Sequence, residues 1–194
     1  MTAMKRKNKI IILGITGGIA AYKCPELVRE LTKSGSDVHV ILTEAAKHFV
    51  TPLTLQTLSN NPVYIDMFGL IPPYPPLEKG GRGGFTHHIS LADMADLIVV
   101  APACANTIAK VAHGICDDLL TTTICATKAP VLFVPSMNVN MWNNPITQEN
   151  ISRLKKLGYK FIDPEYGELA CGYKGVGRMA NMETILNSIK NIKK

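Results

Sequence analysis

The chain of 194 residues is poor in several residue types, and each shortage excludes a class of protein. Its five cysteines form no CxxC pair and no zinc-type cluster with histidine, so neither a disulfide framework nor a metal site is expected. Charged residues make up only 19% against 46% hydrophobic ones, which excludes a disordered polar chain. No apolar run approaches the ~20 residues that span a bilayer, and the N-terminus lacks a signal-peptide layout. We therefore expect a cytoplasmic protein in a reducing compartment, with no membrane partner.

The net charge of +6 is concentrated at the two ends of the chain. Residues 1–9 form a basic N-terminal extension, and three more lysines lie near the C-terminus (Lys190, Lys193 and Lys194). The remaining 14 basic residues nearly balance the 15 acidic ones. A nucleic-acid-binding protein needs a basic patch on the fold itself, so we expect no nucleic-acid partner.

Short apolar runs followed by turn residues and helical patterns predict buried parallel strands. The expected strands are Ile10–Leu13, Val38–Leu42, Leu97–Ala101 and Val131–Val134. The expected helices are Ile19–Leu31, Thr107–Ala112, Leu119–Ala126 and Met182–Ile192. This alternation predicts an α/β domain with a mostly parallel sheet over residues 10–192. Because such sheets bind ligands beyond the carboxyl ends of their strands, the segment after each strand is a candidate site.

Residues 70–85 interrupt this alternation, because proline and glycine dominate them (LIPPYPPLEKGGRGGF). Such a segment holds no regular structure for long. It is either an exposed loop that tolerates insertions or a mobile lid beside the active site.

A glycine turn follows the first strand (GITGGIAA, 14–21), and Gly17 and Gly18 let a ligand approach the backbone closely. The helix start behind this turn suits a phosphate. The turn is not a GxGxxG motif, and the second strand ends at Thr43 instead of a ribose-binding acid, so a mononucleotide fits better than NAD. Thr43 either donates to the phosphate or caps the next helix. The glycines are equally compatible with a purely structural turn.

Small and polar residues follow the third and fourth strands. Cys104–Thr107 leave room for a flat ring and offer it hydrogen bonds, or they form an ordinary capped helix start. Asn138 lies in PSMNVNMW (135–142), and an asparagine can bind a carboxylate or amide through both ends of its side chain. The methionines and the tryptophan of this segment are otherwise core residues.

Two further segments contain reactive side chains. His87 and His88 precede an apolar stretch, and histidine acts as an acid or base near neutral pH, although a single histidine is more often structural. The segment GELACGYKGVGRM (167–179) places Cys171 among four glycines, near Lys174 and Arg178, which can lower the pKa of a thiol. The same segment is also compatible with a plain surface turn.

Four stretches together resemble one family, the homo-oligomeric flavin-containing Cys decarboxylases. They are TGGIAAYK (16–23), HISLADMADLIVVAPACANTIAKVAHGICDDLLTTT (88–123), PSMNVNMWNNP (135–145) and ELACGYKGVGRM (168–179). The motifs PxMNxxMW and LACGxxGxGRM are the specific ones. The resemblance spans Ile10 to about Ile192 and implies a Rossmann-like or flavodoxin-like parallel sheet, with helices on both faces, that holds FMN in a single domain.

The resemblance also implies residue roles. The implied cofactor-binding residues are Gly17, Gly18, Ile19, Thr43, Cys104, Ala105, Asn106, Thr107 and Ser136. The implied substrate-binding residues are Asn138, Met141, Ala170, Cys171 and Gly172, within or facing a substrate clamp over residues 165–179. The implied catalytic residues are His88, which fits the HIxLA pattern better than His87, together with Asn138 and Cys171. Cys104 stands where the family usually has Ser or Thr, and Tyr173 replaces the common Asp after ACG.

The implied reaction is FMN-dependent decarboxylation of 4′-phospho-N-pantothenoyl-L-cysteine to 4′-phosphopantetheine in coenzyme A biosynthesis. The cysteine moiety is oxidised to a thioaldehyde, CO₂ leaves to give an enethiolate whose charge needs positioned donors, and the final reduction takes a proton from Cys171. Asn138 binds the substrate carboxylate. The implied assembly is a homotrimer or homododecamer with sites between subunits, with or without a fused phosphopantothenate–cysteine ligase domain.

Other functions stay open on the sequence. Peptidyl-cysteine decarboxylases of this family lack the equivalent of Cys171, and flavin prenyltransferases lack LACG and PxMNxxMW. A non-catalytic flavin-binding regulatory subunit of a phosphatase usually carries a long acidic tail, and this sequence contains none. A nucleotide-binding module without catalysis would not need His88, Asn138 and Cys171 together.

Overall fold

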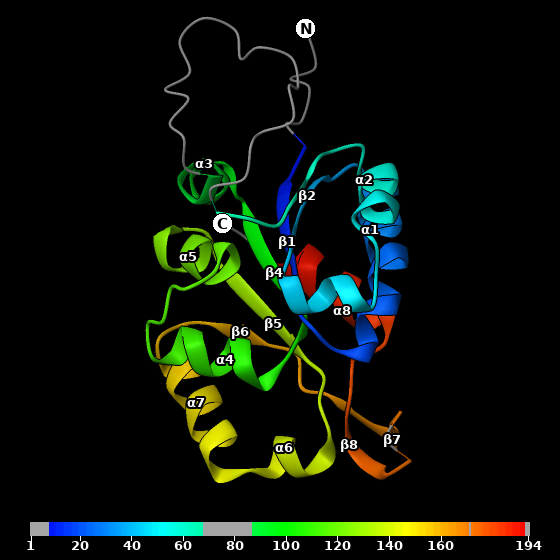
Figure 1. Ribbon diagram of the computed structural model, residues 1–194, viewed down its shortest axis with the longest axis vertical. Helices are drawn as coiled ribbons and strands as arrows, with labels where there is room; N and C mark the ends of the chain where they lie inside the picture. Colours follow the sequence, from blue (N-terminus) through cyan, green and yellow to red (C-terminus); the bar gives the residue numbers. More distant parts are fainter. Residues whose placement is uncertain (1–7, 68–86, 171, 193–194) are drawn as a thin grey trace, which may run out of the picture.

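A parallel sheet forms the centre of the computed structural model, which describes residues 8–67, 87–170 and 172–192. Within them, six strands pair in the order β3-β2-β1-β4-β5-β6 (Figure 1). Their bounds are β1 (Ile10–Ile15), β2 (Asp37–Leu42), β3 (Val63–Tyr64), β4 (Leu97–Ala103), β5 (Val131–Pro135) and β6 (Lys160–Phe161). The strand order reverses between β1 and β4, and this switch point is where open α/β sheets bind ligands.

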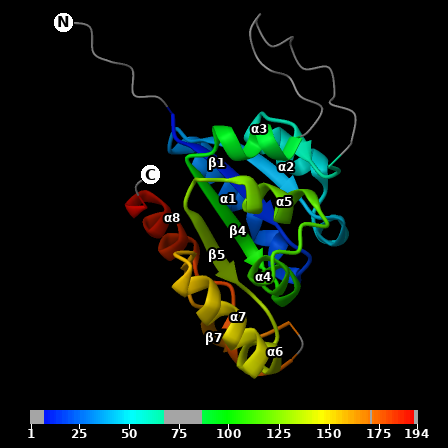
Figure 2. The same cartoon turned by 90° about the vertical axis from the view of Figure 1, so that its left-hand side faces the viewer.

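Helices cover both faces of the sheet, as Figures 1 and 2 show. One face packs against α1 (Cys24–Lys33), α2 (Pro52–Ser59) and α8 (Met182–Asn191). The other packs against α3 (His87–Met94), α4 (Ala105–Ala112), α5 (Leu119–Ala126) and α7 (Pro145–Lys156). Strand side chains alternate between the faces, so Ile11 and Leu13 of β1 join the first core and Ile12 joins the second. None of the helices in the described ranges is both long and apolar enough to cross a membrane.

Three short elements lie at the carboxyl edge of the sheet. They are two 3₁₀ helices, η1 (Ile19–Lys23) and η2 (Glu44–His48), and the helix α6 (Val139–Asn143). An antiparallel hairpin of β7 (Glu165–Glu168) and β8 (Lys174–Arg178) lies beside α6 at the lower end of Figure 1. A Cβ added at Gly175 would lie 2.7 Å from Cγ2 of Val139, so this glycine lets the hairpin pack directly on α6.

The predicted α/β fold with helices on both faces is confirmed, and all four predicted strands are present. The edge strands β3 and β6 were not predicted, because two residues each are too few to form a pattern. The predicted helix over residues 19–31 is wrong as one element: it divides into η1 and α1. Pro25 lacks an N–H and is tolerated only in the first turn of a helix, so α1 begins at Cys24. Most of the predicted basic extension and all of residues 70–85 lie outside the described residues.

Candidate active site

Two adjoining cavities lie beyond the carboxyl ends of the central strands. The larger, about 650 Å³, is lined by the segments after β1 and β2, by residues 65–67 and by parts of α4 and α5. The smaller, about 460 Å³, is lined by η1, by the segment after β5 and by the β7–β8 hairpin. Gly17, Cys104 and Met141 line both cavities. Volumes of this size suit a cofactor or a small substrate, and molecules in the two cavities would meet at these three residues.

Thr16 connects the ends of β1 and β4 beneath the cavities. Its buried hydroxyl donates to the carbonyl oxygen of Pro102 at 2.6 Å and accepts from the N–H of Cys104 at 3.0 Å. These bonds position the start of α4 against the glycine turn. Sequence reasoning missed this role, because only its neighbours Gly17 and Gly18 stood out in the turn.

The glycine turn brings the segments after β1 and β2 into contact. A Cβ at Gly17 would lie 2.5 Å from the Cβ of Ala45, so only glycine allows this approach. A Cβ at Gly18 would meet no atom within 4 Å, so the backbone there faces open space. Behind the turn the chain forms the five-residue 3₁₀ helix η1 instead of the expected longer helix. Gly18 and Ile19 line the smaller cavity, and Gly17 lines both.

Thr43 has a buried side-chain oxygen without a hydrogen-bond partner in the described part of the chain. Its backbone is engaged, because its N–H donates to Ile15 at 3.1 Å and its carbonyl accepts from Ala46 at 2.9 Å. The side chain does not cap η2, although the residue holds the N-cap position. Of the two roles considered for Thr43, the cap is therefore excluded. The other predicted role is a hydrogen bond to a bound molecule. Thr43 lines the larger cavity, where its hydroxyl could bond a polar group of that molecule.

The predicted segment Cys104–Thr107 lies where α4 begins, and all four residues line the larger cavity. Sγ of Cys104 lies 3.4 Å from Oγ1 of Thr107, so the two side chains share a weak hydrogen bond. The small Ala105 and the exposed Asn106 leave room above the turn. Gly17, the Thr43 hydroxyl without a partner in the described chain and these polar residues all line the larger cavity, and together they fit a flavin mononucleotide.

An ion-pair cluster on the far wall of the larger cavity was not predicted. Nζ of Lys110 lies 2.8 Å from Oδ1 of Asp117 and 3.3 Å from Oδ2 of Asp118. The hydrogen bond with Asp117 raises the pKa of Lys110 and lowers that of Asp117. Asp118 also caps α5, since its Oδ1 accepts from the N–H of Thr121 at 2.8 Å. The cluster thus links α4 to α5, and sequence reasoning missed it because the partners are seven and eight residues apart across a loop.

Asn138 lies in the smaller cavity as the N-cap of α6. Its Oδ1 accepts a hydrogen bond from the N–H of Asn140 at 2.8 Å. This bond of the amide oxygen caps the helix, and the binding of a carboxylate or amide by Asn138 stays a prediction. Met141, one turn further along, is half exposed and lines both cavities.

The β7–β8 hairpin is hydrogen-bonded to the segment after β5. The N–H of Met137 donates to the carbonyl of Gly177 at 3.0 Å, and a Cβ at position 177 would overlap the carbonyl oxygen of Met137. Ser136 Oγ makes a weaker contact with the same carbonyl at 3.4 Å. Ser136 is predicted to bind the cofactor, and it lines the smaller cavity together with Asn138 and Ala170.

Two further residues of the predicted clamp are Cys171 and Gly172. Gly172 is exposed, with a φ of 81°, and its N–H donates to Leu169 at 2.9 Å, so it forms a turn of the hairpin outside the cavity lining. Cys171 lies outside the described residues. The other four cysteines, Cys24, Cys104, Cys116 and Cys125, are free thiols.

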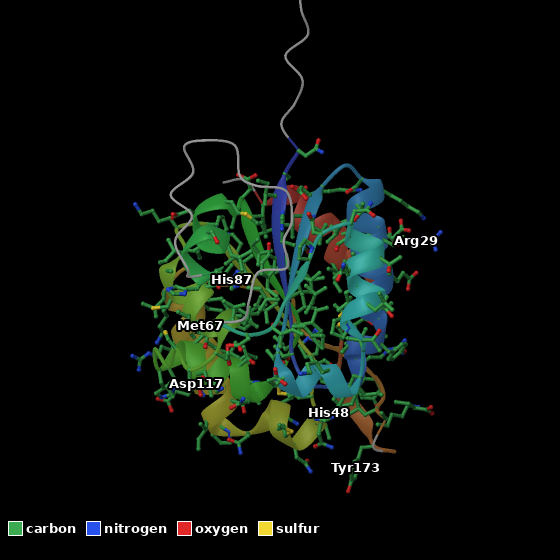
Figure 3. All side chains as sticks on the ribbon, turned by 45° about the horizontal axis from the view of Figure 1, so that its top comes forward. Arg29, His48, Met67, His87, Asp117 and Tyr173 are labelled. Atoms are coloured by element: carbon green, nitrogen blue, oxygen red, sulfur yellow. The ribbon has the colours of Figure 1, made fainter. Side chains whose placement is uncertain are left out.

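His88 lies on α3 and lines neither cavity. Its Nδ1 is buried without a hydrogen-bond partner in the described ranges. The ring of His87 packs edge-on against Tyr64 at 5.4 Å, and Figure 3 shows His87 on α3, well apart from Tyr173 of the hairpin. A single chain therefore brings Asn138 together with the glycine turn, but it does not bring His88 to Asn138.

Comparisons with known proteins agree with this geometry. A probable phosphopantothenoylcysteine decarboxylase of Streptococcus mutans is 46% identical over 185 residues, which cover 94% of this chain and 98% of that protein. The coenzyme A biosynthesis bifunctional protein CoaBC of Bacillus subtilis is 48% identical over 179 residues, covering 92% of this chain. This chain spans only 42% of the length of that bifunctional relative.

Solved structures show the same fold. A mutant of PPC decarboxylase in complex with pantothenoylaminoethenethiol superposes with a TM-score of 0.79 at 31% identity, covering 95% of this chain and 97% of that one. The FMN binding protein AtHal3 gives a TM-score of 0.77 at 32% identity, with 95% and 96% covered. The Flavoprotein family model matches residues 1–193, and the chain belongs to the Flavoprotein family.

Proposed function

We propose that this protein is an FMN-dependent phosphopantothenoylcysteine decarboxylase. It converts 4′-phospho-N-pantothenoyl-L-cysteine to 4′-phosphopantetheine and CO₂, a step of coenzyme A biosynthesis. The observation that carries the proposal is the pair of cavities joined at Gly17, Cys104 and Met141. One cavity has the features of a flavin site, and the other contains Asn138 of the decarboxylase-type motif. The names of the relatives agree with a carboxy-lyase of this specificity.

The larger cavity holds the cofactor in this proposal. The Thr43 hydroxyl, which lacks a partner in the described chain, donates to the flavin nucleotide, and Asn106 and Thr107 bind its polar edge. Thr16 keeps this wall in place through its bonds to Pro102 and Cys104. When bound, FMN supplies two-electron oxidation of the cysteine moiety and later returns the electrons.

The smaller cavity holds the substrate. Asn138, oriented by the bond from the N–H of Asn140, donates through its amide nitrogen to the substrate carboxylate. Met141 covers the junction of the cavities and keeps water from the reacting carbon. Cys171 gives the proton that completes the thiol product, and its presence separates this enzyme from one that stops at the enethiol.

His88 completes the site from a second copy of the chain in this proposal. It lies on α3, away from Asn138 of its own chain, and its buried Nδ1 has no partner in the described residues. A homotrimer, alone or packed into a dodecamer, places α3 of one subunit beside the cavities of the next. Because some relatives are bifunctional, a phosphopantothenate–cysteine ligase domain is a further proposed partner. A cytoplasmic location stays a prediction.

The proposal is tested by CO₂ release from two substrates. The FMN-loaded protein is incubated with 4′-phosphopantothenoyl-L-cysteine and, separately, with a peptide that ends in cysteine. We expect release from the first substrate alone. Release from the peptide alone would replace the proposal with a peptidyl-cysteine decarboxylase, and a protein that does not bind FMN would refute the enzyme assignment.

A further inference from the structure

The smaller cavity carries cationic side chains that the roles above do not use. Lys23, the last residue of η1, and Arg178, the last residue of β8, both line it. Among the described lining residues, Glu168 is the one carboxylate, so these three side chains together carry one net positive charge. This excess favours an anion in the cavity.

Arg178 is held in place by packing. A Cβ at Gly167, on the facing strand, would lie 3.3 Å from Cδ and 3.5 Å from Nη1 of Arg178, so the arginine lies flat across this glycine. In the described chain its guanidinium makes no hydrogen bond or ion pair with another side chain, and the residue is exposed. A planar guanidinium with open donors matches the oxygens of a phosphate in a two-bond geometry.

Lys23 approaches the cavity from the other wall. It is half-buried, and its Nζ lies 6.0 Å from the centre of the Tyr22 ring, a weak contact with an exposed side chain. No carboxylate in the described ranges lies within ion-pair distance of it. Lys23 and Arg178 therefore offer two charges of one sign, from η1 and β8, to the same space.

We infer that Lys23 and Arg178 bind a phosphomonoester, and that the phosphate belongs to the substrate. The inference rests on the proposed function. A substrate with a carboxylate at one end and a phosphate at the other needs two separate anion-binding points. Asn138 supplies the first, and this cationic pair supplies the second within the same cavity.

The phosphate of FMN is the other source of this chemistry. Thr43 and the start of α4 line the larger cavity, whereas Lys23 and Arg178 line only the smaller one, which Gly18 and Ile19 of the glycine turn also line. The position of the cationic pair therefore favours the substrate over the cofactor.

The test compares 4′-phosphopantothenoyl-L-cysteine with its dephosphorylated form on FMN-loaded protein. The ratio of kcat/KM for the two substrates is measured for the natural sequence, for Arg178→Gln and for Lys23→Gln. We expect each change to lower this ratio by about 10- to 100-fold, as the loss of a charge-assisted hydrogen bond predicts. Arg29→Gln is the matched control, because Arg29 is an exposed residue of α1 that projects away from the site, and it leaves the ratio unchanged (Figure 3).

Two results would overturn the inference. Equal losses with both substrates would show that the pair does not recognise the phosphate, and for Arg178 would favour an effect on Cys171 instead. A weaker FMN affinity with an unchanged ratio would assign the phosphate to the cofactor.

A binding measurement separates this inference from the proposed function. Calorimetry with 4′-phosphopantetheine and with pantetheine needs no turnover. We expect the phosphorylated ligand to bind at least about tenfold more tightly, and Arg178→Gln to remove this preference. If the protein decarboxylates neither substrate but keeps this preference, the proposed function fails and the anion site stands. No preference in the natural sequence would refute the anion site.

Discussion

At the scale of single residues, the environment of Thr43 is the strongest indication of a bound cofactor. A buried hydroxyl without a partner costs free energy unless something binds it. The backbone N–H and carbonyl of Thr43 are both hydrogen-bonded, and its side chain does not cap η2, so its buried hydroxyl has no partner among residues 8–67, 87–170 and 172–192. It lies in the wall of the larger cavity, next to the glycine turn.

Replacing this hydroxyl tests its role. Thr43→Val keeps the shape of the side chain but removes the donor, and we expect the Kd for FMN to rise about tenfold, equivalent to ~1.4 kcal/mol. Quenching of flavin fluorescence on titration measures the Kd. Thr43→Ser, which keeps the hydroxyl, stays within about threefold of the natural sequence. Identical affinities for the valine variant and the natural protein would remove Thr43 from the cofactor site.

Cys24 differs from Thr43, because its buried side chain has a hydrogen-bond partner. Its Sγ donates to the carbonyl of Ala101 at 3.1 Å, and burial raises the pKa of its thiol from 9.0 to about 12. The protonated thiol is therefore favoured in the folded state. Its contribution to stability is complete below pH 9.0 and is lost as the pH rises towards about 12.

Alkylation separates Cys24 from the exposed thiols. Thiolate is the reactive form, so native protein treated with iodoacetamide at neutral pH keeps Cys24 unmodified, and peptide mass mapping reads the result. Protein unfolded in urea is the control, in which Cys24 reacts. Modification of Cys24 in native protein at the rate of the exposed Cys125 would contradict its burial.

At the scale of elements, the site depends on the hydrogen bonds that connect the carboxyl ends of β1 and β4. Thr16 at the end of β1 is only 1% exposed and satisfies both the carbonyl of Pro102 and the N–H of Cys104. Removing its hydroxyl leaves two buried backbone groups without partners. The cost of such a change exceeds that of losing an exposed hydrogen bond.

Thr16→Val is expected to lower the free energy of unfolding by about 1–3 kcal/mol and to weaken FMN binding, because α4 loses its anchor. Urea unfolding followed by circular dichroism measures the first effect. Thr16→Ser retains the hydroxyl and loses less than ~1 kcal/mol. Unfolding midpoints that coincide for the valine variant and the natural protein would show that the link is not stabilising.

The elements also show what a sequence can predict. The core strands were found because each is a short, mostly apolar run that is largely buried, although His39 interrupts the run of β2. The helix α5 was found to the residue, since it spans Leu119–Ala126. The start of α1 was misjudged because apolar spacing continues through η1, and Pro25 alone marks the boundary. Of the site, motif residues such as Asn138 were located, but the direction of the Asn138 amide depends on its bond from Asn140. Thr16 and Lys110 act through partners distant in the chain or across a loop, which no local pattern shows.

At the scale of the whole molecule, the separation of His88 from Asn138 requires an explanation. Both belong to motifs of one family, yet one lies on α3 and the other at the start of α6 (Figure 1). In the homotrimer proposed above, a site shared between copies in a closed ring would bring them together without any change in the fold.

Complementation tests the shared site. His88→Asn removes the acid–base group, and Asn138→Asp keeps the helix cap but repels the substrate carboxylate, so each variant alone is expected to be inactive. In co-expressed mixed rings, about a quarter of the sites combine an intact Asn138 with an intact His88. Decarboxylation should therefore return to about a quarter of the natural rate.

A mixture as inactive as its components would place both residues in one chain. Mixing the purified variants without subunit exchange is the control, and it stays inactive.

Mass spectrometry of the product tests the central claim most directly. FMN-loaded protein is incubated with 4′-phosphopantothenoyl-L-cysteine, and we predict 4′-phosphopantetheine as the product, a saturated thiol that has lost only CO₂. Cys171→Ser is predicted to give the enethiol, which is two hydrogens poorer. Unchanged substrate from the natural protein, or the enethiol as its final product, would contradict the assignment.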